Sequence, residues 1–186
     1  MSSRVDDIQL IDRILAGEKH LYSEMVDRHK RYAFTVAFRI LNHKPDAEEA
    51  TQDAFIKAYH HLGNFNRQSK FSTWLYRIVF NTAITYKRKQ KNHFQSIENA
   101  IVEYSPEGET TMELTDKRKF IDRAMSRLSD NDRLAITLFY LKEFSLEEIS
   151  EITATPANTI KVRIHRARIR LAEELKNILN KEALTL

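Results

Sequence analysis

Glycine and proline are scarce in this chain, with three of each among 186 residues. Tight turns between strands depend on these residue types, so their scarcity favours long helices over a turn-rich β fold. Apolar residues also recur at helical spacing along most of the chain. The sequence therefore predicts an all-α protein, and its length is sufficient for two small helical domains.

The first half of the chain contains four predicted helices. Their expected ranges are residues 5–16, 18–41, 46–62 and 71–89. Asp46 and Glu49 have the spacing of a capping box, and Gly63 suits the C′ position, so these residues predict the ends of the third helix. A polar loop, NFNRQSK, precedes the fourth helix.

An acidic segment separates this half from the remainder of the chain. Residues 92–116 contain six acids and no Lys or Arg, and their apolar periodicity is weak. Such a composition buries too little apolar surface to offset the entropy of ordering, so a linker is expected. The predicted domains are residues 1–91 and 118–180, joined by residues 92–117.

Basic side chains gather on either side of the acidic segment. Residues 87–91 are KRKQK, and residues 161–170 contain five Lys or Arg and no acid. A polyanion partner requires local basic surface of this kind. A solvated helix face would give the same pattern, and composition alone leaves both interpretations open.

Several function classes are excluded by composition. The chain has no Cys, which excludes disulfides, thiolate metal sites and Cys nucleophiles. Its beginning, MSSRVDDIQLIDRIL, lacks the apolar core of an export signal, and no apolar run approaches the roughly 18 residues of a membrane span. A cytoplasmic location without membrane insertion is expected.

Two helices joined by a tight turn are predicted near the C-terminus. Ser145 and Glu148 form a capping-box pair at the start of the first helix. Thr155 can cap the second helix, and Pro156 fits its first turn, where a missing N–H costs nothing. A short helix, a tight turn and a longer basic helix constitute the helix-turn-helix pattern.

The second helix of this pair divides into three faces at 100° per residue. The expected buried arc comprises Ile160, Ile164, Ala167 and Leu171. The opposite arc comprises Asn158, Val162, His165, Arg166 and Ile169, and the flanks carry Lys161, Arg163, Arg168 and Arg170. This layout suits a helix in the major groove of DNA, with central side chains on base edges and flanking cations on phosphates. The alternative is a core-packed helix with a solvated cationic face.

Three sequence blocks together resemble the extracytoplasmic-function sigma factors of bacterial RNA polymerase. SLEEISEITATPANTIKVRIHRARIRL is similar to the helix-turn-helix of sigma domain 4. DAEEATQDAFIKAYHHLGNF and FSTWLYRIVFNTAITYKRKQ are similar to two blocks of sigma domain 2. The resemblance spans about residues 5–175, and the order of the blocks and the acidic connector also match. It implies a sigma domain 2 and a sigma domain 4 joined by the acidic linker.

The resemblance implies that the helix-turn-helix binds the −35 promoter element. The candidate residues are Asn158, Thr159, Lys161, Val162, Arg163, His165, Arg166 and Arg168. Arg166 can donate two hydrogen bonds to a guanine edge, and Val162 can contact a thymine methyl group. The family often has Ser at the position of Val162, so a different base preference is expected beneath it.

The resemblance also implies that domain 2 opens DNA at the −10 element. The candidate residues are Asn64, Phe65, Lys70, Ser72, Trp74, Arg77, Asn81, Thr85 and Arg88. Captured bases need polar groups and aromatic walls. Core packing is the alternative for Trp74, and a buried structural hydrogen bond is the alternative for Asn81. The family often has an acid where Thr85 stands.

Core RNA polymerase is the implied partner, through its β′ clamp helices and β flap. The candidate residues for the clamp helices are Glu49, Gln52, Asp53, Phe55 and Lys57. An acidic helix with one exposed aromatic ring, Phe55, would suit an Arg-rich partner helix. The resemblance further implies promoter DNA and an anti-sigma protein as partners, no catalysis by the chain itself and no cofactor.

Two other functions are compatible with parts of the sequence. A helix-turn-helix regulator could bind duplex DNA without polymerase, but such proteins are usually dimers and no spare dimerisation helix is evident. An enzyme could use a metal held by His20, Glu24, Asp27, His60 and His61. Scattered surface histidines explain these residues better, because further ligands at a suitable spacing are missing.

Overall fold

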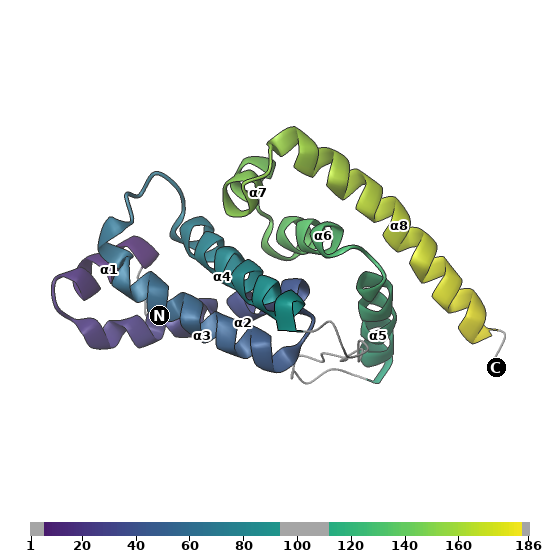
Figure 1. The fold of residues 1–186 in the computed structure, drawn as a ribbon, viewed down its shortest axis with the longest axis horizontal. Coiled ribbons are helices and arrows are strands. Elements are labelled where there is room, and N and C mark those ends of the chain that lie inside the picture. Colours follow the sequence, from purple (N-terminus) through teal and green to yellow (C-terminus); the bar gives the residue numbers. More distant parts are fainter. Residues whose placement is uncertain (1–5, 94–111, 184–186) are drawn as a thin grey trace. The chain divides into compact units, whose positions relative to one another are not determined.

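The computed structural model describes residues 6–93 and 112–183, and every regular element within these ranges is a helix. The helices divide into two compact units (Figure 1). The first unit holds helices α1 to α4. The second holds α5, α6, α8 and the first part of α7. The all-α prediction is confirmed, whereas most of the predicted linker lies outside the described residues.

The first unit follows the predicted helices closely. Its helices are α1 (Asp7–Leu15), α2 (Tyr22–Leu41), α3 (Lys44–His60) and α4 (Phe71–His93), with short 3-10 turns η1 (Lys19–Leu21) and η2 (Leu62–Asn64). Helices α2, α3 and α4 pack against one another. Alanines at 47, 50, 54 and 58 of α3 are fully buried, so α3 can lie close to its neighbours.

The predicted ends of the third helix are wrong. Helix α3 begins at Lys44 with His43 as its N-cap residue, because Pro45 occupies the first turn, where a missing N–H costs nothing. No capping box forms. The Asp46 carboxylate instead accepts a hydrogen bond from Gln90 of α4. Gly63 lies within η2 and not at a C′ position.

The remaining helices are α5 (Met112–Ser126), α6 (Asp130–Lys142), α7 (Leu146–Thr153) and α8 (Ala157–Ala183). Helix α4 ends at His93 and α5 begins at Met112, so helices extend into both ends of the predicted 92–117 linker. The capping box before α7 is confirmed: Ser145 N donates to Glu148 Oε2 over 2.9 Å, and Glu148 N donates to Ser145 Oγ over 3.2 Å. These two bonds satisfy exposed donors at the start of the helix-turn-helix.

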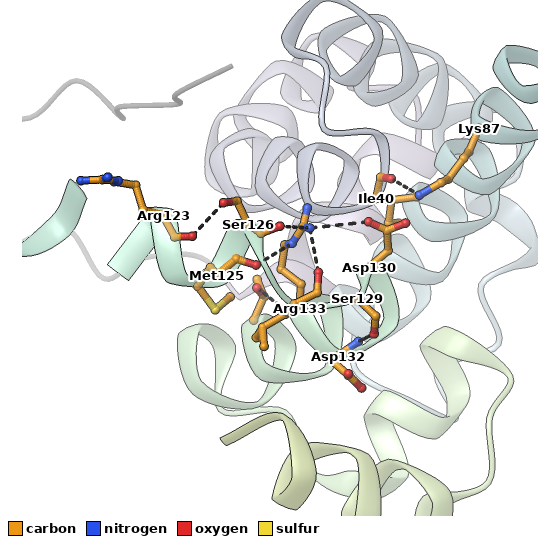
Figure 2. A network of polar contacts seen from close by, with 11 residues as sticks. Ile40, Lys87, Arg123, Met125, Ser126, Ser129, Asp130, Asp132 and Arg133 are labelled. Atoms are coloured by element: carbon orange, nitrogen blue, oxygen red, sulfur yellow. Dashed lines mark hydrogen bonds and ion pairs between the residues drawn. The ribbon is translucent and has the colours of Figure 1, made fainter. Parts of the chain in front are cut away.

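A buried arginine joins α5 to α6 (Figure 2). The Arg133 side chain is 6% exposed, and its Nε donates to the Met125 carbonyl over 3.0 Å. Its Nη2 donates to the carbonyls of Ser126 and Leu128 over 3.1 and 3.0 Å. The last carbonyls of a helix have no partner within the helix, so Arg133 closes the end of α5 and fixes the turn into α6.

The described helices include none that is both long and apolar enough to cross a membrane.

Candidate nucleic-acid and polymerase interfaces

Helix α8 has the predicted division into buried and exposed faces. Ile160 and Ala167 are fully buried, and Ile164 is 6% exposed. On the opposite face, Val162 is 48% exposed and Ile169 is 50% exposed. The face opposite the buried residues is therefore open to a partner, and it offers apolar as well as polar and charged side chains.

Exposed residues cover the candidate −35 surface. Those in solvent are Asn158, Thr159, Lys161, Val162, His165, Arg166 and Arg168, whereas Arg163 is half-buried. Asn158, Thr159, Val162, Arg163 and Arg166 line an open depression of about 450 Å³ together with Asp132 and Arg170. Within the described part of the chain, the cations at 161, 163, 166 and 168 form no ion pair. Their charges are therefore available to a polyanion.

Arg170 differs from the other cations of α8. Its Nη1 lies 2.9 Å from Oδ2 of Asp132 in the first turn of α6. Arg170 was expected on the flank of the helix with Lys161, Arg163 and Arg168, and its ion pair with Asp132 distinguishes it from these three cations.

The candidate −10 region combines an aromatic cluster with a polar loop. Phe65, Phe71 and Trp74 lie with ring centroids 5.4 to 5.7 Å apart. Phe65 is 6% exposed and Phe71 is 3% exposed, whereas Trp74 is half-buried. Phe65 thus belongs to the core, and its ring packs against Trp74 of the candidate −10 region. Trp74 packs against both phenylalanines and is half-buried, so contact with the unpaired strand stays a prediction, with core packing as its alternative.

The loop beside Trp74 is held by local polar contacts. Asn66 Oδ1 accepts a hydrogen bond from the Gln68 backbone N–H over 3.2 Å, and Arg67 adopts a left-handed φ of 60°. The Arg67 guanidinium pairs with Asp12 of α1. Asn64 and Lys70 are exposed and Ser72 is half-buried. The loop therefore presents polar groups next to the partly exposed indole.

Helix α4 continues the candidate −10 surface. Arg77, Asn81, Thr85 and Arg88 are all exposed and follow one another at helical spacing, as predicted. The alternative for Asn81, a buried structural hydrogen bond, is wrong because its side chain lies on the solvent side of α4. Thr85 Oγ1 donates to the Asn81 carbonyl over 2.9 Å, so the short side chain at 85 remains close to its own helix.

The candidate polymerase surface on α3 is acidic and firmly positioned. Glu49 and Gln52 are exposed. Asp53 is half-buried, and its Oδ2 accepts a hydrogen bond from the Tyr86 hydroxyl over 2.7 Å. Loss of solvation, followed by the hydrogen bond to Asp53, raises the pKa of Tyr86. The exposed Lys57 donates from Nζ to Thr82 Oγ1 over 3.2 Å, so both polar side chains are braced by α4.

The expectation of an exposed Phe55 ring is wrong. Phe55 is 6% exposed, and its carbonyl accepts a hydrogen bond from the Tyr22 hydroxyl of α2 over 2.6 Å. Sequence reasoning missed the neighbouring Ile56, which is 56% exposed. Residues of α2 and α3, including Tyr22, Val26, Gln52, Phe55 and Ile56, line an open groove of about 830 Å³. An apolar groove edged by polar side chains suits a partner helix.

The residues of the metal-enzyme alternative are engaged elsewhere or scattered. Glu24 pairs with Arg28, and Asp27 pairs with Lys30 over 2.7 Å. Among residues 6–93 and 112–183, no group of three or more His, Asp or Glu is placed to hold a metal ion.

Comparison with known proteins matches both units. The Sigma-70 region 2 family matches residues 25–93, and the Sigma-70 region 4 family matches residues 120–171. The ECF RNA polymerase sigma factor SigW of Bacillus subtilis is 35% identical over 182 residues, which cover 90% of this chain and 96% of SigW. The chain belongs to the extracytoplasmic-function (ECF) family of RNA polymerase sigma factors.

Two further sigma factors are similar to this chain over most of its length. The ECF RNA polymerase sigma-E factor of Escherichia coli K12 is 35% identical and covers 90% of this chain and 93% of its own length. The solved structure of sigma factor RpoE with the anti-sigma factor NepR, from Bartonella quintana, matches with a TM-score of 0.69 at 26% identity. That match covers 83% of this chain and 96% of RpoE. As an ECF sigma factor, the chain is a transcription initiation factor that acts with RNA polymerase and not an enzyme.

Proposed function

We propose that the second unit, sigma domain 4 of residues 118–180, recognises the −35 promoter element through α8. One observation carries this assignment: Ile160 and Ala167 are fully buried while Val162 is 48% exposed on the opposite face. In the proposed complex, Arg166 and Val162 contact base edges. Lys161, Arg163 and Arg168 contact phosphates on either side.

The first unit, sigma domain 2 of residues 1–91, captures the unpaired strand of the −10 element. The partly exposed indole of Trp74 offers one face to an unpaired base, and Lys70 and Ser72 lie beside it with polar groups. The exposed row Arg77, Asn81, Thr85 and Arg88 leads away from the indole along α4. This arrangement supports a path for single-stranded DNA along the helix.

The same unit binds the β′ clamp helices of core RNA polymerase through α3. Glu49, Gln52 and Asp53 provide an acidic, polar rim, and the hydrogen bond from Tyr86 fixes the Asp53 carboxylate before binding. Phe55 and Ile56 contribute to the adjacent apolar groove. A preformed carboxylate beside an apolar groove reduces the ordering cost of binding a basic, amphipathic helix.

Further partners follow from this role. Sigma domain 4 is expected to contact the β flap of the polymerase. Because the RpoE structure that matches this chain contains an anti-sigma factor, an anti-sigma protein is also proposed as a partner here. A protein that acts on core polymerase and promoter DNA works in the cytoplasm, which is the location proposed.

Run-off transcription with core polymerase and a library of genomic promoters tests this function. The chain and core polymerase together should give transcripts from a small set of promoters that share −35 and −10 elements. Binding of the chain alone to duplex sites, with no effect on where polymerase starts, would contradict the proposal and favour a conventional helix-turn-helix regulator.

A further inference from the structure

Arg170 and Asp132 connect α8 to α6 across 38 positions of sequence. Arg170 Nη1 donates to Asp132 Oδ2 over 2.9 Å. The two side chains differ in exposure: that of Arg170 is 60% exposed, whereas that of Asp132 is only 11% exposed. The carboxylate is thus nearly enclosed, and the guanidinium covers it from the solvent side.

Asp132 is fixed independently of Arg170. It lies in the first turn of α6, and its backbone N–H donates to the Oγ of the N-cap residue Ser129 over 3.3 Å. A carboxylate in the first turn of a helix is stabilised by the helix dipole. The backbone that carries Asp132 is therefore held at the start of α6, whereas Arg170 reaches the carboxylate through a long side chain that is 60% exposed.

The same carboxylate faces the DNA-binding side of α8. Asp132 lines the open depression with Arg163, Arg166 and Arg170. Of these three arginines, only Arg170 forms an ion pair within the described part of the chain. Asp132 therefore acts selectively on one cation of the surface.

We infer that Asp132 is a positioning residue that withholds Arg170 from the DNA backbone and uses it to brace α8 against α6. This inference rests on the proposed −35 recognition by α8. For Arg170 to reach a phosphate, the nearly buried Asp132 carboxylate would have to lose its partner. An unpaired charge in such a place is costly, so the pair persists when DNA binds.

Withholding Arg170 from the DNA backbone should increase the specificity of α8 for promoter DNA over other sequences. Each phosphate contact adds affinity for every DNA sequence, because it releases counterions without contacting bases. With Arg170 withheld, fewer cations contribute to this sequence-independent affinity. The ratio of promoter binding to mixed-sequence binding is thereby kept higher than the number of arginines on α8 would predict.

The test measures binding of the holoenzyme, formed from core polymerase and the full chain, between 50 and 200 mM salt. The probes are a duplex carrying a promoter obtained by run-off transcription and a mixed-sequence duplex of equal length. Asp132→Asn should steepen the slope of log affinity against log salt by about one unit on both duplexes. Over this salt range, that change corresponds to an additional loss of affinity of about 3.5-fold. It should also lower the ratio of promoter to mixed-sequence affinity.

The second variant measured in the same salt titration is Arg170→Ala. In the unsubstituted chain it should leave the salt slope unchanged, because Arg170 contacts no phosphate. Combined with Asp132→Asn, it should return the slope to its original value. If Asp132→Asn does not fold, as judged by thermal melting, Arg170→Ala alone still tests the inference. A slope of log affinity against log salt that is shallower by about one unit in Arg170→Ala would overturn it.

Asp130→Asn is the matched control. It removes one negative charge from the same first turn of α6, on a side chain that is 45% exposed and whose Oδ1 lies 3.7 Å from Nη2 of Arg133. Thermal melting checks that loss of this long contact leaves the fold intact. Equal slope changes for Asp130→Asn and Asp132→Asn would overturn the inference in favour of a general charge effect. A holoenzyme that does not discriminate the promoter would instead contradict the proposed function, and the slopes on the mixed-sequence duplex would still decide the role of Asp132.

Discussion

The ring centroids of Phe65 and Trp74 lie 5.4 Å apart, with the ring planes inclined by 47°. Phe65 follows η2 and Trp74 lies in the first turn of α4, so this contact joins the two ends of the polar loop. Because Phe65 is buried and Trp74 is half-buried, the core holds the indole at the surface in a fixed position. A rigid aromatic surface of this kind can receive an unpaired base without a further ordering cost.

Replacement of this ring should impair promoter opening more than folding. Trp74→Ala removes a base–aromatic stack worth about 1–3 kcal/mol, so open complexes should become correspondingly rarer on duplex promoters. A template with a pre-melted −10 bubble should restore much of the activity, because the unpairing cost has already been removed. Transcription on duplex and bubble templates, beside thermal melting, measures both effects.

The neighbouring Leu75 provides the control for that experiment. Leu75 is fully buried, and Leu75→Ala should destabilise the first unit by about 2–5 kcal/mol. Its transcription defect should then be the same on duplex and bubble templates. If Trp74→Ala behaves like Leu75→Ala, the indole is a core residue and the proposed strand contact is wrong.

The −35 surface should separate into residues that discriminate bases and residues that only add affinity. Arg166→Ala should relax the preference at one promoter position and cost about 1–3 kcal/mol. Lys161→Ala should weaken binding to all sequences and reduce the salt slope by about one unit. Affinities across a panel of single-base promoter variants check this, and identical profiles for both variants would show that the assignment of faces on α8 is incorrect.

Arg133 should be essential for the stability of the second unit. Arg133→Met nearly keeps the length of the side chain but removes the three hydrogen bonds that the guanidinium donates to the carbonyls of Met125, Ser126 and Leu128. A loss of about 2–4 kcal/mol in the free energy of unfolding is expected from urea titration. Arg127→Ala, which removes only the surface pair with Glu174, should cost less than about 1 kcal/mol. Similar costs for the two variants would contradict a structural role for Arg133.

The ion pairs of Asp7 should make the stability of the first unit depend on pH in the acid range. Its carboxylate lies 2.9 Å from His29 Nε2 and 3.1 Å from Arg28 Nη1, and the hydrogen bond with His29 is the main cause that lowers the pKa of Asp7 below its ordinary 3.8. A lowered folded-state pKa contributes stability that is present above the unfolded value and is lost as the pH falls through the folded value. Stability should therefore decline below about pH 4, and less steeply in Asp7→Asn.

Urea unfolding at a series of pH values measures this decline. Asp27→Asn is a suitable control, because that side chain is 66% exposed and its surface pair with Lys30 contributes little. If Asp7→Asn and Asp27→Asn give the same acid limb as the unsubstituted chain, the Asp7 pair does not contribute to stability in the way described.

The helices and the exposed face of α8 could be predicted because they depend on local pattern. Ile160, Ile164 and Ala167 recur at the helical period, and that period alone determines which face is buried. The Ser145 and Glu148 capping box is equally local, since its two hydrogen bonds link residues three positions apart.

The errors arose where tertiary packing decides. Phe55 is buried because α3 contacts both α2 and α4, so its buried arc is wider than the alanine face indicates. The partner of Arg170 lies 38 positions away, and no local pattern identifies it. The Asp46 carboxylate contacts Gln90 of α4 and the His43 side chain, and not the backbone N–H groups of a capping box, and the partner in α4 could not be read from local sequence.

The capture of unpaired −10 bases can be measured by the permanganate reactivity of thymines across a promoter selected by run-off transcription. Permanganate reports unpaired bases, whose capture is the proposed role of the first unit, while the second unit positions the polymerase. Reactive thymines are expected at the −10 element only when the chain and core polymerase are both present, and many fewer are expected with Trp74→Ala. Protection of the −35 duplex by the chain alone, with no reactive thymines after core polymerase is added, would contradict this proposal.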